Sequence, residues 1–175
     1  IRDVERSRGL GDVYKRQRYD NTGRLTQVMS NNDTPHILQT NPCYITENNN
    51  GDIVTTGMWK QAVVVTSSEG VYRFSYTGPP SSGSRLKPRG VCTDALSHIL
   101  ICDEHTHTVQ MLSQDGKFLK YLLTEESQGI YLPTCLTYDL HTHRLWVLSC
   151  ELHHGARKMA TLSLYRHINR EFSLI

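Results

Sequence analysis

The chain has 175 residues, which is enough for one domain with a hydrophobic core. Hydrophobic residues make up 38% of the sequence, aromatic residues 8% and charged residues 21%, a composition that is ordinary for a soluble globular protein. The formal net charge is +2, and no apolar stretch approaches the roughly 18 residues of a membrane span, so we expect no membrane insertion.

The first residues differ from the rest of the chain. Residues 1–17 show no apolar periodicity and contain five basic residues, and their string GLGDVYKRQ resembles adapter read-through at the ends of transcriptome-derived translations. We therefore expect residues 1–18 to be a non-native or disordered leader, with a genuine disordered linker as the alternative. These 18 residues hold six of the 19 basic and three of the 17 acidic residues, which leaves 13 basic and 14 acidic residues. The remaining chain is not basic, and this weakens a role in binding nucleic acid.

The predicted elements begin with a turn and a strand. Asp20 and Gly23 mark the turn, residues 25–29 have an apolar strand pattern, and the polar residues 30–40 predict a crossover. Pro42 then opens a unit of four predicted strands, at residues 43–46, 52–56, 61–66 and 71–76. The run from Asn48 to Gly51 supplies the first hairpin of this unit, because Asn and Gly tolerate a positive φ angle.

A second four-stranded unit follows the loop at residues 77–87, which is rich in proline, glycine and serine. Its strands are predicted at residues 91–93, 98–102, 108–112 and 118–123, and Asp115-Gly116 marks a tight hairpin before the last strand. Pro133 opens a third unit with strands at residues 135–138, 145–148 and 162–165 and a long middle loop at residues 149–160. No Asp-Gly turn follows Tyr165, so we expect this unit to lack an outer strand of its own.

The units repeat with one period. Opening prolines at positions 42, 88 and 133 and turn glycines at positions 23, 70 and 116 are spaced by 45 to 47 residues. A period in the mid-forties with four antiparallel strands per unit is typical of β-propeller blades. A solenoid of helix pairs would need runs of about ten or more residues at helical spacing, and the sequence has no convincing run of that kind. We therefore predict an all-β fold, a partial β-propeller of about three to four blades.

The predicted divisions follow from this period. They are a leader at residues 1–18, the end of a preceding blade with its crossover at 19–40, blades at 41–87 and 88–132, and a final blade at 133–175.

The order of residues within a blade resembles the NHL repeat. The shared features are Pro-x-x-Val or Leu, an Asp turn, a hydrophobic strand that ends at Asp103, and the string Gln-Asp-Gly-Lys-Phe-Leu. The strings PRGVCTDALSHILICD and GIYLPTCLTYDLHTHRLWVLS are similar to the C-terminal propeller of tripartite-motif proteins, particularly invertebrate ones. The resemblance covers roughly residues 19–165 and is strongest over residues 88–123.

This resemblance implies a six-bladed ring in a cytoplasmic parent protein that carries an N-terminal RING, B-boxes and an oligomerising coiled coil. It also implies that the parent is an E3 ubiquitin ligase whose propeller chooses the protein target. The zinc ions of that family belong to the RING and B-boxes, which are not in this sequence. We therefore expect the chain itself to be non-enzymatic and to hold no cofactor.

Two groups of cysteine and histidine have metal-like spacing. They are Cys102 with His105 and His107, and Cys150 with His153 and His154. Aligning the second strands of the blades puts the two groups out of register by two positions. We therefore favour solvated loop histidines and small buried thiols over a zinc site. The number of cysteines is odd and their spacing shows no disulfide framework, which favours reduced thiols in an intracellular protein.

The same alignment makes a packing prediction. It equates Ile99 with Leu145, and hence Leu100 with Trp146, in the second strands of successive blades. We expect Leu100 and Trp146 to pack at contacts between blades.

Two aspartates also recur with the period. Asp94 and Asp139 each lie six residues after the opening proline of a blade. Such an Asp usually accepts hydrogen bonds from amides of its own turn, and we favour that role over ligand binding. The predicted inner strands are apolar at positions 45, 91, 92, 136 and 137, without the convergent carboxylates of metal-dependent propeller hydrolases. Because no Ser-His-Asp or Cys-His arrangement follows from the spacing either, a propeller hydrolase is the least favoured function.

The remaining candidate site is a surface. In a propeller, the loops between second and third strands share one face with the crossovers between blades, and rigidly held loops commonly carry binding residues. The candidate partner-binding residues in these loops are Trp59, Lys60, Arg85, Lys87, Arg89, His105, His107, Tyr131 and His153, with His154 beside the last. Aromatic, arginine and histidine side chains favour a protein partner, although Trp59 and Tyr131 could instead cover blade edges. RNA binding dominated by Arg85, Lys87 and Arg89 is the second hypothesis.

Overall fold

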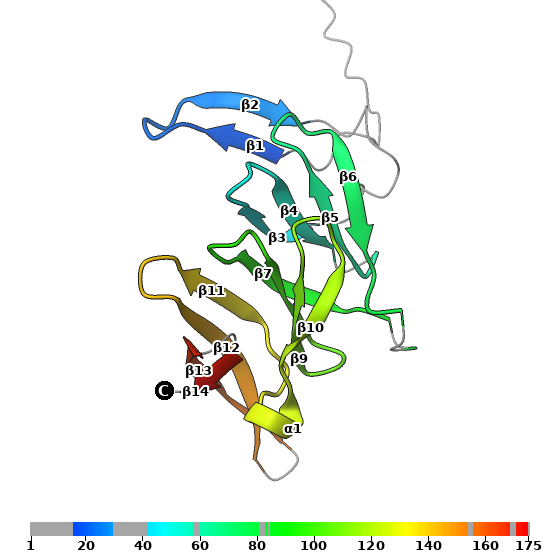
Figure 1. Ribbon diagram of the computed structural model, residues 1–175, viewed down its shortest axis with the longest axis vertical. Coiled ribbons are helices and arrows are strands. Elements are labelled where there is room, and N and C mark those ends of the chain that lie inside the picture. The colour runs from blue at the N-terminus through cyan, green and yellow to red at the C-terminus, as the bar shows by residue number, and fades with distance from the viewer. Residues whose placement is uncertain are drawn as a thin grey trace, which may run out of the picture.

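The computed structural model describes residues 16–29, 42–57, 60–80, 83, 85–153, 156–168 and 171–174. These residues form four antiparallel β-sheets that follow one another along the long axis of the molecule (Figure 1). We call the sheets blades 1 to 4 in chain order. The fold is all-β and propeller-like, as the sequence predicts.

Blades 2 to 4 each contain four strands that pair in sequence order, whereas blade 1 contains two described strands. Blade 1 consists of β1 (Arg16–Tyr19) and β2 (Leu25–Met29). Blade 2 consists of β3 (Pro42–Glu47), β4 (Ile53–Gly57), β5 (Ala62–Thr66) and β6 (Tyr72–Tyr76). Blade 3 consists of β7 (Pro88–Thr93), β8 (Ile99–Asp103), β9 (Thr108–Leu112) and β10 (Phe118–Leu123), followed by the short helix α1 (Glu125–Gln128). Blade 4 consists of β11 (Cys135–Asp139), β12 (Arg144–His153), β13 (Ala156–Ile168) and β14 (Glu171–Leu174).

Repeated turn geometry explains why the period of the sequence gives repeated blades. Gly23, Gly70 and Gly116 close the turn between the last two strands of blades 1, 2 and 3, with φ angles of 82°, 91° and 83°. A positive φ is readily available to glycine and strained for most other residues. Because Gly23 has the place of Gly70 and Gly116, β1 and β2 occupy the third and fourth strand positions of a blade.

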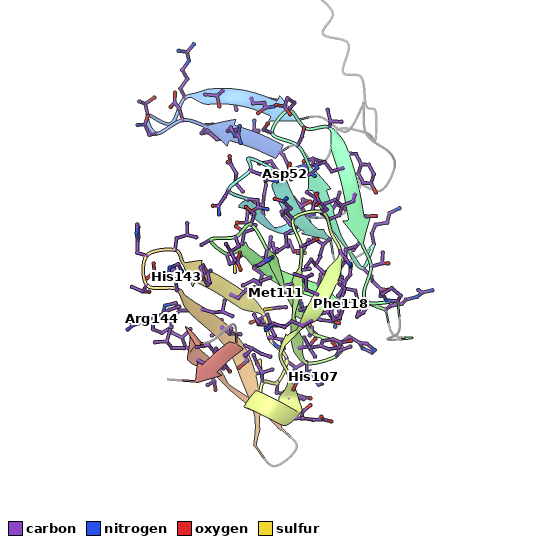
Figure 2. The ribbon with its side chains drawn as sticks, viewed as in Figure 1. Asp52, His107, Met111, Phe118, His143 and Arg144 are labelled. Carbon is purple, nitrogen blue, oxygen red and sulfur yellow. The ribbon has the colours of Figure 1, made fainter. Side chains whose placement is uncertain are left out.

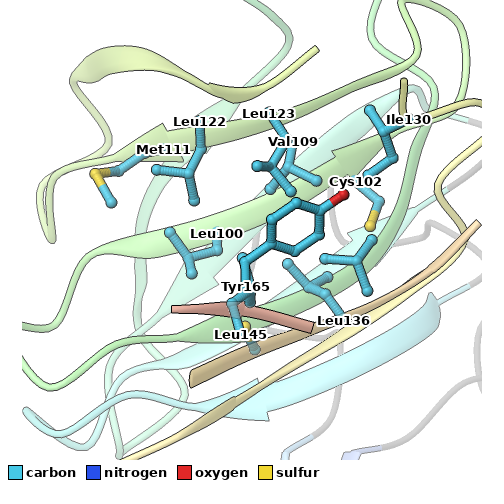
Figure 3. Packing of buried hydrophobic residues seen from close by; sticks show 12 residues of the cluster. Leu100, Cys102, Val109, Met111, Leu122, Leu123, Ile130, Leu136, Leu145 and Tyr165 are labelled. Atoms are coloured by element: carbon cyan, nitrogen blue, oxygen red, sulfur yellow. The ribbon is translucent and has the colours of Figure 1, made fainter. Parts of the chain in front are cut away.

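The hydrophobic core lies between blades, since alternate residues of a strand point to opposite faces of its sheet. In β8, Ile99 and Ile101 pack with blade 2, whereas Leu100 and Cys102 pack with blade 4. Both faces of blade 3 are therefore covered, and β8 and β9 are buried along their whole length. Figure 3 shows the contact of blades 3 and 4, where the ring of Tyr165 lies among Leu100, Val109 and Leu136.

The predicted equivalence of Leu100 and Trp146 agrees with the alternation of these strands, but of the two only Leu100 packs at a contact between the described blades. Leu145 and Val147 of β12 face blade 3, as Ile99 and Ile101 face blade 2. Trp146 lies between them in the strand and therefore on the opposite face of blade 4, where it is partly exposed.

The first strands of blades 3 and 4, β7 and β11, approach closely at Gly90. Its amide donates a hydrogen bond to the carbonyl oxygen of Thr134 at 2.9 Å, across the contact between blades 3 and 4. A Cβ atom on Gly90 would lie 2.7 Å from the Cα atom of Cys135, so only glycine fits this contact without moving backbone.

Three expectations from the sequence are corrected. Residues 16–18 belong to β1 and not to a leader, and the Arg16 Nη1 atom donates to Thr66 Oγ1 of blade 2 at 3.0 Å. The supposed middle loop at residues 149–160 is mostly the continuation of β12 and β13, which pair from Arg144 and Arg166 up to His153 and Ala156. This hairpin is rich in polar and charged residues, so its sequence shows no apolar strand pattern. Its pairing depends on backbone N–H and C=O groups, which polar residues supply as well as apolar ones do.

The final blade also has the outer strand that the sequence analysis did not expect. β14 pairs antiparallel with β13, from Tyr165 opposite Leu174 to Ile168 opposite Glu171. The prediction relied on an Asp-Gly turn, and this strand follows without one.

Candidate partner-binding surface

The predicted loops are held together on one side of the stack. We call this side the loop face, formed by the β4–β5 and β8–β9 loops and by the crossovers before β7 and β11. A backbone hydrogen bond from the Glu104 amide to the Lys87 carbonyl, at 3.0 Å, joins the β8–β9 loop to the crossover before β7. Another, from the Cys150 amide to the Tyr131 carbonyl at 2.9 Å, joins the crossover before β11 to β12. Figure 2 shows His107 on this side, near α1, and His143 and Arg144 at a β11–β12 turn away from it.

Glu104 organises the first part of the loop face. Its carboxylate is buried and forms ion pairs with Lys87, at 2.7 Å from Nζ, and with Arg89. Burial alone would raise the pKa of Glu104, but the hydrogen bonds from Lys87 and Arg89 outweigh burial and hold this pKa below its ordinary value. Two of the three residues in the predicted basic cluster are thus engaged by one carboxylate, which the sequence analysis did not foresee.

His107 and Tyr131 form the second fixed part of the loop face. Their ring centroids are 4.2 Å apart with planes inclined by 33°. The Leu132 amide donates a hydrogen bond to His107 Nδ1 at 3.3 Å, so the proton of a neutral ring lies on Nε2. His107 and Leu132 have positive φ angles of 55° and 45°. Such angles are uncommon outside glycine, and the contacts between the two loops hold them in place.

The other predicted residues differ in how exposed their side chains are. Lys60, Arg85 and His105 are exposed, and Tyr131 is half-buried against His107. Trp59 and His154 lie outside the described residues, as does the side chain of His153 at the end of β12. The structure therefore brings Lys87, Arg89, His107 and Tyr131 into defined contacts and leaves Arg85 and His105 presented to solvent.

A polar hollow beside the β8–β9 loop was not anticipated from the sequence. Its volume is about 280 Å³, and its lining residues are Thr106, Thr108, Tyr121, Thr124, Glu125 and Glu126. They come from the β8–β9 loop, β9, the outer strand β10 and the start of α1, all within blade 3 and the helix that follows it. Only the folding of blade 3 brings them together.

Beneath this hollow lies a buried network of polar side chains. Tyr76 Oη of blade 2 donates to Gln110 Oε1 of blade 3 at 2.7 Å, and Gln110 Nε2 donates to Asp103 Oδ2 at 3.0 Å. Burial raises the pKa of Tyr76, so its hydroxyl keeps the proton that it donates. The network connects two blades and supports the loop that begins after Asp103.

The recurrent aspartates have the structural role that the sequence favours. Asp94 Oδ1 accepts hydrogen bonds from the amides of Leu96 and His98, both at 2.9 Å. Asp139 Oδ1 accepts from the His141 amide at 2.9 Å, and its other oxygen accepts from the Thr142 hydroxyl. The hydrogen bonds from Thr142 and His141 lower the pKa of Asp139. These carboxylates hold the turns between first and second strands.

Of the two cysteine and histidine groups, only Cys102 with His105 and His107 lies wholly within the described residues, since His154 and the side chain of His153 fall outside them. No three side chains of His, Cys, Asp or Glu among the described residues are arranged to hold a metal ion. Cys102 is buried between blades, and burial raises the pKa of its thiol well above the ordinary value, whereas His105 is exposed. Burial likewise raises the pKa of the Cys92 thiol. Both thiols therefore keep their protons within the contact between blades 3 and 4.

No protein-family model and no curated protein matches the chain. Among the described residues, no helix is long and apolar enough to cross a membrane.

Solved structures do share the fold. A streptogramin B lyase matches with a TM-score of 0.56 and 18% identity, over 87% of this chain and 47% of that one. Virginiamycin B lyase from Staphylococcus aureus matches with a TM-score of 0.57 and 16% identity, over 89% of this chain and 50% of the lyase. A functionally unknown protein from Desulfotomaculum acetoxidans matches with a TM-score of 0.58 and 12% identity, over 95% and 49%. This chain thus spans about half the length of these structures, and likeness at such low identity shows a propeller-like fold alone.

Proposed function

We propose that the chain is a protein-recognition module of the NHL type and that it binds its partner through the loop face. The observation that carries the proposal is the fixed arrangement of the loops around His107 and Tyr131 on one side and Glu104 on the other. Loops that are ordered before binding lose less conformational entropy on association. Arg85 and Tyr131 then supply residue types that commonly dominate protein interfaces, and His105 is exposed on the same face.

The loop face favours a protein over RNA. Lys87 and Arg89, which the RNA hypothesis would use for phosphate contacts, both form ion pairs with Glu104. The exposed Glu125 and Glu126 near the same face would repel a phosphate backbone. RNA therefore remains an outcome of the test below and is not a second proposal.

The resemblance to tripartite-motif proteins extends the proposal to the whole protein. We propose that the parent is a cytoplasmic E3 ubiquitin ligase, oligomeric through a coiled coil, in which this module selects the protein to be modified. The catalytic zinc-binding RING would lie elsewhere in that parent, and this module would contribute binding energy alone.

The test uses substitutions on the loop face. Partners captured by the full-length protein are identified, and their affinity is measured for the wild type, Arg85→Ala and Tyr131→Ala, with the exposed turn residue Lys117→Ala as the control. We expect each loop-face substitution to weaken partner binding by about 1–2 kcal/mol and the control to leave it unchanged. Tyr131→Ala is also checked by thermal unfolding, since this ring packs on His107.

Two other outcomes are informative. If the captured ligand is RNA and its affinity falls steeply with salt, with a slope that drops by about one for each basic residue removed, the second hypothesis is correct. If none of the substitutions changes the affinity of the identified partner, recognition does not occur on the loop face.

A further inference from the structure

We propose that the hollow beside blade 3 is an anchor site for the cationic side chain, arginine or lysine, of a partner protein. The inference rests on the proposed function, because it names the chemistry of the partner that the same face would bind. It concerns the cavity of about 280 Å³ lined by Thr106, Thr108, Tyr121, Thr124, Glu125 and Glu126. This volume lies just below the roughly 300–1,000 Å³ of sites for drug-sized ligands, so one long side chain is the better match.

The rim of the cavity is negatively charged. Glu125 and Glu126 are exposed at the start of α1, and none of the lining residues is basic. Lys87 and Arg89, on the same face, form ion pairs with Glu104. A cation that enters the cavity therefore meets two carboxylates and no like charge among the lining residues.

A buried carboxylate lies under the cavity floor. Asp103 is 1% exposed, and Thr106 Oγ1 donates to its Oδ2 at 2.7 Å and lies 2.8 Å from the hydroxyl of Thr108. The Asp103 oxygens also accept from the Lys87 and His105 amides and from the Gln110 side-chain amide. These donors are all uncharged, so they orient the carboxylate without supplying a positive charge. Its charge acts on the cavity through a buried, low-dielectric region, where electrostatic attraction is stronger than in water.

Tyr121 supplies an aromatic wall. It is 40% exposed, and its ring packs edge-on against Phe118 with centroids 5.1 Å apart. Guanidinium and ammonium groups are attracted to the face of a tyrosine ring, and a guanidinium can also pair with carboxylates through two parallel hydrogen bonds. Carboxylates, threonine hydroxyls and a tyrosine ring together fit a cationic head on an apolar stem.

The experiment uses the 175-residue chain and small probes. Saturation-transfer NMR, observed on the ligand, compares Nα-acetyl-arginine methylamide and its lysine counterpart with Nα-acetyl-citrulline methylamide, which has nearly the shape of arginine but no charge. We expect the cationic probes to bind about fivefold or more tightly than the citrulline probe, and the relative affinity of arginine and lysine shows which head group the cavity prefers.

Matched variants locate the binding. The double substitution Glu125→Gln with Glu126→Gln should weaken binding of the cationic probes about fivefold, because it removes two negative charges from the rim of the cavity. Both side chains are exposed, so we expect the fold to stay intact. Tyr121→Leu should also weaken them, and Glu69→Gln, an exposed carboxylate on a turn of blade 2, is the control with no expected change. Equal binding of the citrulline probe, no detectable binding of either cationic probe, or unchanged binding by the double variant would overturn the inference.

Failure here is distinguishable from failure of the proposed function. Partner affinities of Arg85→Ala and Tyr131→Ala judge the loop face independently, since neither residue lines the cavity.

Discussion

The hydrogen bond between Tyr76 and Gln110 offers a sharp test of how the blades are joined. Tyr76 Oη in β6 donates to Gln110 Oε1 in β9 at 2.7 Å, and Gln110 is fully buried. Tyr76→Phe removes the hydroxyl and keeps the ring, so Gln110 Oε1 loses this donor within the contact of blades 2 and 3. Removing one partner of a buried hydrogen bond costs about 1–3 kcal/mol, and we expect a loss of unfolding free energy in this range.

The assay is urea unfolding followed by circular dichroism. Tyr19→Phe is the control, because the Tyr19 hydroxyl contacts Gln17 on an exposed surface and its removal should change the unfolding free energy by less than about 0.5 kcal/mol. Gln110→Leu is then made in the wild type and in Tyr76→Phe. We expect the cycle to show a coupling of about 0.5–3 kcal/mol, as found for residues in contact. A Tyr76→Phe cost equal to that of the control, or a cycle without coupling, would refute the reasoning.

Three further predictions concern a blade surface, pH and the exposed apolar residues of blades 2 and 4. In a closed ring, Trp146→Ala should cost about 3–5 kcal/mol in urea unfolding, because the next blade would cover this face; a loss below about 1 kcal/mol would mean that Trp146 stays exposed. The folded pKa of Glu104 lies below its unfolded value, so its stabilising contribution is present above the ordinary glutamate pKa of 4.5 and is lost as the pH falls below it. The difference in unfolding free energy between wild type and Glu104→Gln should therefore shrink below that pH, and a difference independent of pH would contradict the assignment. Ile45 and Leu162 are 59% and 62% exposed on blades 2 and 4, so the isolated chain should self-associate in size-exclusion chromatography, and a compact, cooperative monomer would argue against this.

Much of the blade architecture was predictable because its causes are local. Turn residues with positive φ recur at Gly23, Gly70 and Gly116, and short runs of β-branched and aliphatic residues lie between such turns. The Asp94 carboxylate could be assigned to its own turn for the same reason, since its hydrogen bonds span four residues at most.

The elements that sequence reasoning missed depend on contacts between distant segments or on backbone pairing alone. The extension of β12 and β13 needs only ladder hydrogen bonds, so its polar residues gave no strand pattern. The pairing of Glu104 with Lys87 and Arg89 joins residues that are 17 and 15 positions apart at the open end of the β7–β8 hairpin, and it depends on the register that puts Pro88 opposite Asp103. The polar hollow arises where the start of α1 lies beside β10 and the β8–β9 loop of the same blade.

The central claim is that recognition occurs on the loop face, and amide hydrogen exchange on the complex with the identified partner tests it most directly. The proposal predicts that the partner slows exchange at residues 103–108 and 124–134 and leaves the turns at residues 94–98 and 113–117 unchanged. Protection confined to those turns, with residues 103–108 and 124–134 exchanging as in the free chain, would contradict the proposal.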